Sequence, residues 1–389
     1  METRKLYYED CHLRQFSATV LSCEPTEKGF CVILDQTAFY PEGGGQACDL
    51  GILGDARVLD VQEQNETVCH ICDKPLTVNQ PVTGEIDWER RFDLMQQHTG
   101  EHILSGLIHQ QFGYHNSGFH VGNGVMEVDF DGPIPPDALE KLEQQANAVV
   151  WQNLPVNCSY PAEAELPGIP YRTKRALPWP VRIVEIPGND ICACCGVHVG
   201  HTGEVGLIKI ISCVKFHSGV RLEMVCGGRA YRYMQEIFRQ NRQISQLLSA
   251  KMTQTAEAVQ KLSEALHQEK YRAAGLEKEV FEAIAQRFSG QKNVLHFAEN
   301  LSGGSLRELA DCISKQCTGY AAVCSGSEET GYQLCIVSQT DSVRVLGTQA
   351  IQALNGRGGG KDTAFQGTVK ASKTEITAFF KSKESEATL

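Results

Sequence analysis

Two histidines stand four residues apart in the stretch Gln97-His98-Thr99-Gly100-Glu101-His102-Ile103-Leu104. An α-helix completes a turn in about 3.6 residues, so both imidazoles would lie on one helix face. Apolar residues recur at helical spacing through residues 91–112, and Gly113 follows them as a helix-ending glycine. Two imidazoles on one face are half of a zinc site, so further nitrogen or sulfur ligands should come from elsewhere in the chain.

A second group of ligand-type residues follows about a hundred residues later, in Cys192-Ala193-Cys194-Cys195-Gly196-Val197-His198. We prefer Cys194 over its neighbours because its four-residue step to His198 repeats the spacing of the first pair. His98, His102, Cys194 and His198 would then hold one Zn²⁺ per chain. A single thiolate leaves that centre a net positive charge, which can polarise a water or hold an amino group. Whether all four ligands bind at once stays open, and His201 is a spare ligand.

Composition limits the function classes. The 389 residues are too many for one ordinary core, so we expect two to four domains. A net charge of −11 argues against loose, non-specific nucleic-acid binding. The sixteen cysteines follow no apolar leader segment, which favours a reducing cytoplasm and metal or packing roles over disulfides. No apolar run is long enough to span a membrane, so we expect a cytoplasmic protein.

The periodicities predict an α+β multidomain chain with four parts. Residues 1–90 form short apolar runs separated by turn residues, which predicts a small β-barrel. Residues 91–229 mix strands with two helices around both ligand pairs and predict an α+β zinc-binding domain. Residues 230–288 have little glycine or proline, and their apolar residues mostly step by three, four or seven, which predicts a helical coiled-coil arm. Residues 289–389 predict an α/β domain. The arm would serve as a spacer or join a homodimer, or it would fold as an intrachain hairpin.

Two glycine-rich segments lie outside the ligand pairs. In the first, Gly43, Gly44 and Gly45 precede Gln46, and residues without side chains allow a ligand or another backbone to approach closely. A flexible turn explains this segment equally well. The second segment, residues 355–362, fails the phosphate-loop pattern because no serine or threonine follows its lysine. We interpret it as a glycine-rich turn that carries Arg357 and Lys361, either toward an RNA backbone or in a structural role.

A metallopeptidase is the main rival interpretation. His98-Thr99-Gly100-Glu101-His102 matches the H-x-x-E-H pattern, in which the glutamate is the general base. That class expects a downstream carboxylate as the third ligand and has no use for Cys194 and His198. We therefore favour the four-ligand centre over the peptidase.

The order of the two ligand pairs resembles the zinc signature of the editing domain of alanyl-tRNA synthetases and of the long form of free-standing alanyl-tRNA editing (AlaX) proteins. Residues 38–46 resemble the glycine motif that precedes this domain in the family. Residues 194–206 are similar to the family's Cys-Gly-Gly-Thr-His-Val segment, with Cys195 and Val197 as the departures. The last hundred residues resemble the DHH-associated C-terminal domain of those synthetases.

This resemblance implies a trans-editing hydrolase that deacylates tRNA(Ala) mischarged with serine, with glycine as a second candidate, and that binds the acceptor end of tRNA(Ala). Residues 91–229 would be the editing domain. Only about 90 residues precede it, too few for an activation domain, so we expect no aminoacylation. A tRNA-binding module with a structural zinc is the alternative. The homodimer would form through residues 230–288 or through the C-terminal domain.

The resemblance also suggests roles for individual residues. Gly43 to Gly45 with Gln46 would contact the substrate or the RNA end. Glu101 would act as a base or orient a ligand, unless it is a solvated helix residue. The serine hydroxyl needs a polar partner, since a polar group left unpaired opposite alanine costs affinity. We cannot rank its candidates, which are Thr99, Gln97 and His120.

Overall fold

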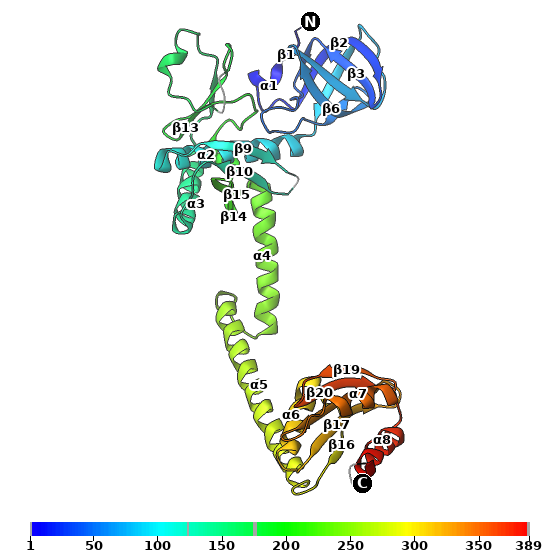
Figure 1. The fold of residues 1–389 in the computed structure, drawn as a ribbon. Helices are drawn as coiled ribbons and strands as arrows, with labels where there is room; N and C mark the ends of the chain where they lie inside the picture. Colours follow the sequence, from blue (N-terminus) through cyan, green and yellow to red (C-terminus); the bar gives the residue numbers. More distant parts are fainter. Residues whose placement is uncertain (1, 123, 174–176, 387–389) are drawn as a thin grey trace. The chain divides into compact units, whose positions relative to one another are not determined.

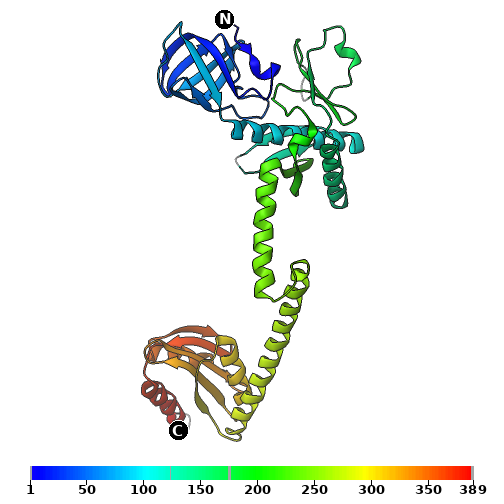
Figure 2. The same cartoon turned by 180° about the vertical axis from the view of Figure 1, so that it is seen from behind.

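The computed structural model describes residues 2–122, 124–173 and 177–386. The chain divides into two compact units, Met1–Gln243 and Ile244–Leu389, and each is described by itself. Strands and helices mix in both units, as predicted (Figures 1 and 2). Within the described residues, no helix has both the length and the apolar character needed to cross a membrane.

The N-terminal part of the first unit is a closed antiparallel barrel with the strand order β2-β3-β7-β6-β5-β8. Inward and outward side chains alternate along β2, with Phe16, Ala18 and Val20 in the core. A short parallel pair joins β1 to β4 beside helix α1. The bounds are β1 Arg4–Lys5, α1 Leu6–Glu9, β2 Gln15–Thr26, β3 Gly29–Leu34, β4 Gln36–Thr37, β5 Gly51–Leu53, β6 Ala56–Gln64, β7 Thr67–Cys72 and β8 Pro81–Ile86.

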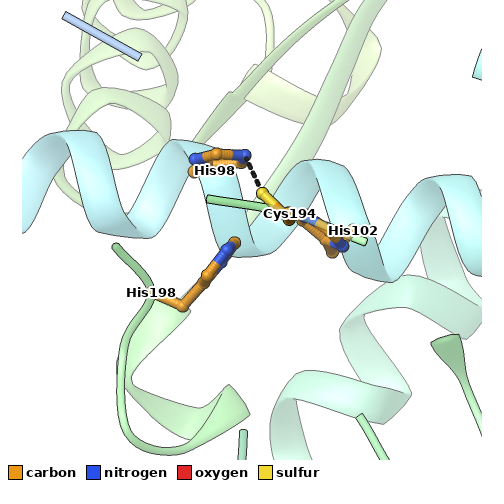
Figure 3. Close-up of side chains that lie close together, drawn as sticks. All are labelled: His98, His102, Cys194 and His198. Atoms are coloured by element: carbon orange, nitrogen blue, oxygen red, sulfur yellow. Dashed lines mark hydrogen bonds between the residues drawn. The ribbon is translucent and has the colours of Figure 1, made fainter. Parts of the chain in front are cut away.

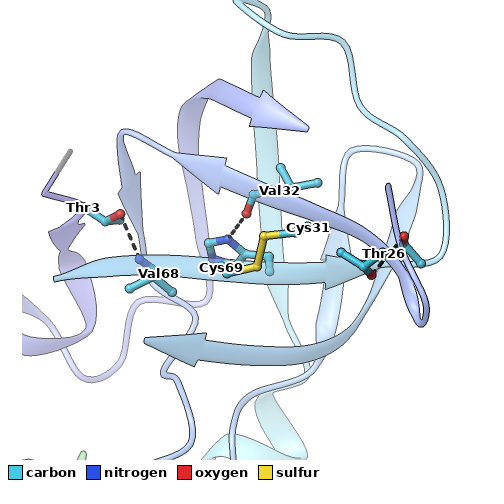
Figure 4. The surroundings of a disulfide bond; sticks show 8 residues. Thr3, Thr26, Cys31, Val32, Val68 and Cys69 are labelled. Carbon is cyan, nitrogen blue, oxygen red and sulfur yellow. Dashed lines mark hydrogen bonds between the residues drawn. A yellow bond between two sulfur atoms is a disulfide. The ribbon is translucent and has the colours of Figure 1, made fainter. Parts of the chain in front are cut away.

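A disulfide joins Cys31 on β3 to Cys69 on β7 (Figure 4). The expectation that the cysteines form no disulfides is therefore wrong for this pair. The ladder places Cys31 opposite Ile71 and Cys69 opposite Ile33, so the two thiols are diagonal neighbours. The two cysteines are 38 residues apart in sequence, and their contact depends on a strand register that composition does not reveal.

Helix α2 (Trp88–Phe112) carries the two histidines and runs through the core of the first unit. Asp87 caps its start by accepting a hydrogen bond from the Arg90 backbone N–H, and Gly113 ends it in the left-handed conformation with φ of 72°. The structure confirms the predicted helix and its last residue, with a start three residues earlier than expected. Because the helix is buried on most sides, the histidines are held in a fixed environment.

Two antiparallel sheets complete the first unit. The larger has the order β14-β15-β10-β9 and packs with α2 and α3 around one apolar core. The smaller has the order β11-β12-β13, and the residue after β13 is Cys194. The bounds are β9 Asn116–Val121, β10 Met126–Phe130, α3 Pro136–Trp151, β11 Asn157–Ser159, η1 Leu166–Gly168, β12 Ile183–Ile186, β13 Asp190–Ala193, η2 Thr202–Val205, β14 Ile208–Phe216 and β15 Gly219–Cys226.

The predicted arm contains two helices, α4 (Gly227–Leu247) and α5 (Thr255–Gln286), with the short turn η3 (Met252–Gln254) before α5. The helical character was predicted correctly. The break around residues 248–254 could not be located from the sequence, because this segment contains no glycine or proline. The coiled-coil pairing stays a prediction.

The rest of the second unit is a five-stranded sheet with the order β16-β17-β18-β20-β19. Among the described strands of this sheet, only β16 and β17 pair in parallel, so the sheet is mixed, unlike the parallel layer that an α/β domain suggests. The bounds are β16 Val294–Ala298, α6 Gly303–Ser314, β17 Tyr320–Ser327, β18 Gly331–Ser338, α7 Arg344–Ala353, β19 Arg357–Gly360, β20 Ala364–Val369 and α8 Lys373–Glu386.

The second glycine-rich segment is an edge strand, β19, so its interpretation as a turn is wrong. A Cβ on Gly358 would lie 2.4 Å from the carbonyl oxygen of Gln366 on the neighbouring strand. Glycine is thus needed here because the two backbones approach closely. Since glycine has a low strand propensity, the sequence pattern does not predict this strand. Arg357 and Lys361 are both exposed.

Candidate metal centre

The two ligand pairs meet in the first unit. His98 and His102 project from α2, while Cys194 and His198 come from the segment after β13 and face them (Figure 3). One ligand atom from each residue lies within 4.8 Å of all the others, and Cys194 Sγ is 3.4 Å from His98 Nε2. Zinc bonds of about 2.0–2.3 Å in a tetrahedron set ligand atoms roughly 3.5 Å apart. The donor set and its spacing therefore fit one zinc ion.

Two local features shape the centre. A Cβ on Gly196 would lie 2.1 Å from Cε1 of His98, so only glycine allows the cysteine segment to pass this close to the imidazole. The Nε2 atom of His198 is buried and has no hydrogen-bond partner among the described residues. Buried polar atoms are nearly always satisfied, so this nitrogen fits a metal ligand.

Two of the ligands have pKa shifts toward the protonation states that bind metals. Burial lowers the pKa of His198 to about 3, which favours the neutral imidazole with a lone pair to donate. Burial alone would raise the pKa of the Cys194 thiol, but the surrounding imidazoles, His98 first, bring it well below its usual range. This shift favours the thiolate, the form that binds metals.

Partners outside the ligand set orient two of the imidazoles. His98 Nδ1 lies 2.8 Å from Gln46 Oε1, and His102 Nδ1 lies 2.9 Å from Asp190 Oδ2. Both oxygens only accept hydrogen bonds, so each Nδ1 donates to its partner and each Nε2 is left facing the other ligands. Arg172 in turn binds both carboxylate oxygens of Asp190, at 2.7 and 2.8 Å. These contacts allow Asp190 to orient His102.

A cavity of about 710 Å³ adjoins the centre. Its lining includes three of the four ligands together with Glu101, Asn116 and Phe119, and the cations Lys5, Arg172 and Arg182 also line it. The cavity is therefore large enough for an aminoacyl group.

Glu101 is buried in this lining and is not a solvated helix residue. Its Oε1 accepts from Ser105 Oγ at 2.5 Å and from Asn116 Nδ2, while its Oε2 lies 3.8 Å from His102 Nε2. Burial would raise the pKa of this carboxyl, but His102 and Arg172 outweigh burial and lower it. Ser105 and Asn116 thus anchor Oε1 of the Glu101 carboxylate, and its Oε2 lies beside the ligands.

Other predicted site residues lie elsewhere than in the cavity lining. Gln97 is buried and bridges the backbone N–H and C=O of Cys226 on β15. Thr99 is fully buried, and its hydroxyl accepts from the Val199 N–H and lies 3.4 Å from His198 Nδ1. His120 is exposed on β9. These contacts give Gln97 and Thr99 positions that support the ligand-bearing segments.

The first glycine-rich segment reaches the centre through Gly44 and Gln46. Gly44 lines the cavity with φ of 59°, and a Cβ there would lie 3.1 Å from Cys195 Sγ. A Cβ on Gly45 would meet the Phe119 ring at 2.5 Å, and the Tyr40 hydroxyl donates to the carbonyl oxygen of Gly43. Close packing of backbone therefore explains these glycines. Gln46 is buried against His98 and does not line the cavity.

Sequence reasoning missed Asp190, Arg172, Asn116 and Gly196. Asp190 stands four residues before Cys194, the same step that separates the members of each ligand pair, and this spacing was an available signal. Asn116 and Arg172 carry no comparable mark, because their roles depend on contacts between distant segments.

Two family models match the chain. Residues 2–90 match tRNA synthetases class II (A), and residues 181–222 match the threonyl and alanyl tRNA synthetase second additional domain. The second match contains Cys194 and His198. Both matched families are described as parts of aminoacyl-tRNA synthetases, in agreement with the predicted resemblance.

Relatives extend the likeness along the chain. The chain is 28% identical to the alanyl-tRNA editing protein Aarsd1 of Danio rerio over 403 residues, which covers 97% of each protein. It is 29% identical to the Mus musculus protein of the same name, over 95% of this chain and 94% of that one. The alanine–tRNA ligase of Ignicoccus hospitalis is 39% identical over 240 residues, which cover 58% of this chain but 26% of the ligase. The predicted resemblance is therefore confirmed: the chain is similar to alanyl-tRNA editing proteins over nearly its whole length.

Proposed function

We propose that the chain is a trans-editing hydrolase that deacylates tRNA(Ala) mischarged with serine, with glycine as a second candidate. The observation that carries this proposal is the group of His98, His102, Cys194 and His198, in which the three histidines are buried, beside a cavity with Glu101 in its lining. The relatives that match nearly the whole chain are named alanyl-tRNA editing proteins. We place the reaction in the cytoplasm.

The four ligands would hold one Zn²⁺ per chain, which when bound supplies a Lewis acid for the ester carbonyl or its attacking water. Glu101 Oε2 would accept a proton from that water as its oxygen attacks the carbonyl carbon. The bond from this carbon to the ribose oxygen then breaks, and the ribose oxygen takes the proton from Glu101. The amino acid leaves as a free acid, and the tRNA keeps its hydroxyl.

Cations near the cavity would hold the RNA end. Arg182 donates to the carbonyl oxygens of Cys194 and Gly196 at 2.9 and 2.8 Å and stacks over the Tyr8 ring at 4.5 Å. Its charge is therefore fixed beside the ligand segment, where it would attract the terminal phosphates of tRNA. We also propose that Arg357 and Lys361 contact RNA from the second unit, whose residues 289–389 would form the DHH-associated domain.

We further propose that residues 230–288 join two chains as a coiled coil. On α5, Val259, Leu262 and Leu266 are exposed and step by three and four residues. Such a stripe on a solvated helix is suited to a partner helix. The remaining boundaries, a barrel over residues 1–90 and an editing domain over residues 91–229, are part of the same proposal.

The test is deacylation of Ser-tRNA(Ala) beside correctly charged Ala-tRNA(Ala), with the wild-type chain and Cys194→Ala. We expect selective loss of serine with the wild type and none with the variant. Stable Ser-tRNA(Ala) in the presence of metal-loaded wild type would contradict the proposal and favour a tRNA-binding module with a structural zinc.

A further inference from the structure

An asparagine oxygen beside the metal centre has no hydrogen-bond partner among the described residues. Asn116, the first residue of β9, is 6% exposed and lines the cavity with His98, His102 and Cys194. Its Nδ2 donates to Glu101, but its Oδ1 is buried and unpaired among the described residues. Since nearly all buried polar atoms are hydrogen-bonded, this oxygen indicates a missing donor.

Chemistry fixes which end of the amide is unpaired. The Glu101 carboxylate can only accept hydrogen bonds, so it requires the NH₂ group of Asn116 and not its oxygen. A flipped amide would place two acceptor oxygens face to face. The strand also holds the residue in place, because Asn116 pairs with Phe130 on β10. Asn116 therefore presents a fixed acceptor beside the reacting group.

We infer that Asn116 Oδ1 accepts the hydroxyl proton of the seryl group and so determines which amino acid is removed. This inference rests on the proposed function. The other candidates for this role are already engaged or lie elsewhere: Gln97 and Thr99 are bonded to backbone groups, and His120 is exposed. A hydroxyl is a suitable donor for a neutral amide oxygen.

The arrangement explains rejection of the correct product. A seryl group would satisfy Oδ1, whereas the methyl group of an alanyl ester would cover the oxygen and leave it unpaired. A site built to bond a hydroxyl disfavours an analogue without one, by roughly ten- to a hundredfold when a single neutral hydrogen bond is lost.

The experiment compares kcat/KM for Ser-tRNA(Ala) and Gly-tRNA(Ala), because glycine keeps the ester and the amino group but lacks the hydroxyl. In Asn116→Ala, loss of the bond to Glu101 should slow both reactions equally, and loss of Oδ1 should slow only the serine reaction. We expect the serine-to-glycine ratio to fall by about tenfold or more.

Ser105→Ala is the matched control, because it removes the other donor to Glu101 Oε1 and leaves Asn116 intact. It should lower both rates and leave the ratio unchanged. An unchanged ratio in Asn116→Ala would overturn the inference and reduce Asn116 to a support for Glu101. If that variant does not fold, Asn116→Leu roughly keeps the side-chain volume, and its serine-to-glycine ratio of kcat/KM is measured instead. A wild type that hydrolyses neither ester would instead refute the proposed function, and the inference with it.

Discussion

Asp190→Asn tests whether a residue that orients the ligand His102 contributes to metal binding while the ligand itself stays unchanged. The carboxylate of Asp190 is 2% exposed and joins His102 Nδ1 to Arg172, whose side chain is 11% exposed. Asparagine has nearly the same shape but only one acceptor oxygen, so it cannot serve both donors. Either His102 loses its orienting acceptor or Arg172 is left as a poorly compensated buried charge.

The structure sets the size of both effects. Loss of an orienting partner typically weakens metal binding about 10- to 100-fold, or about 1.4–2.7 kcal/mol. Removal of one member of a buried ion pair typically costs about 3–5 kcal/mol of unfolding free energy. We therefore expect weaker zinc binding together with lower stability.

The assay is competition for zinc with a chelating dye, on protein shown to be folded by circular dichroism, alongside urea unfolding. Asp73→Asn is the control, because Asp73 forms an exposed ion pair with Arg57 in the barrel. This control should leave zinc affinity unchanged. Wild-type zinc affinity in folded Asp190→Asn would refute the orienting role.

Three further predictions concern the same site. Glu101→Gln keeps the contacts of Oε1 and should lower kcat by about 10²- to 10⁴-fold at unchanged zinc content; unchanged kcat would exclude Glu101 as the base. Gly196→Ala places a Cβ 2.1 Å from His98 and should weaken zinc binding, whereas Gly168→Ala, with open space around it, should not; equal affinities would contradict the packing argument. Burial opposes ionisation of Asp190, but hydrogen bonds from His102 and Arg172 lower its pKa. Its contribution to stability is thus present above about pH 4 and is lost as pH falls through the lower folded pKa. Unfolding at several pH values should show a steeper acid loss for wild type than for Asp190→Asn, and parallel curves would refute this.

Local signals in the sequence were sufficient for the helix that carries the histidines. The glycine at position 113 and the helical spacing before it both act within a few residues, whereas the cap at Asp87 was not recognised and the predicted start came three residues late. The pairing of Cys194 with His198 was likewise a matter of short spacing. These features are visible because their physical causes lie within one turn or one hairpin.

The rest depends on tertiary contacts. Gln46 was expected at the substrate, yet it bonds His98 on a helix that begins 42 residues later in the sequence, at Trp88. The disulfide and the glycine-rich edge strand depend on register between strands, which residue preference does not determine. Asn116 became noticeable only because the folded chain leaves its oxygen unpaired.

The central claim is that the four-ligand centre performs the hydrolysis. The most direct measurement is deacylation of Ser-tRNA(Ala) by one preparation before chelation, after complete removal of zinc and after its return, with circular dichroism recorded at each stage. We predict about one zinc per chain, loss of activity in a metal-free chain that keeps its fold, and recovery when zinc is restored. Full activity in the metal-free chain would contradict the account.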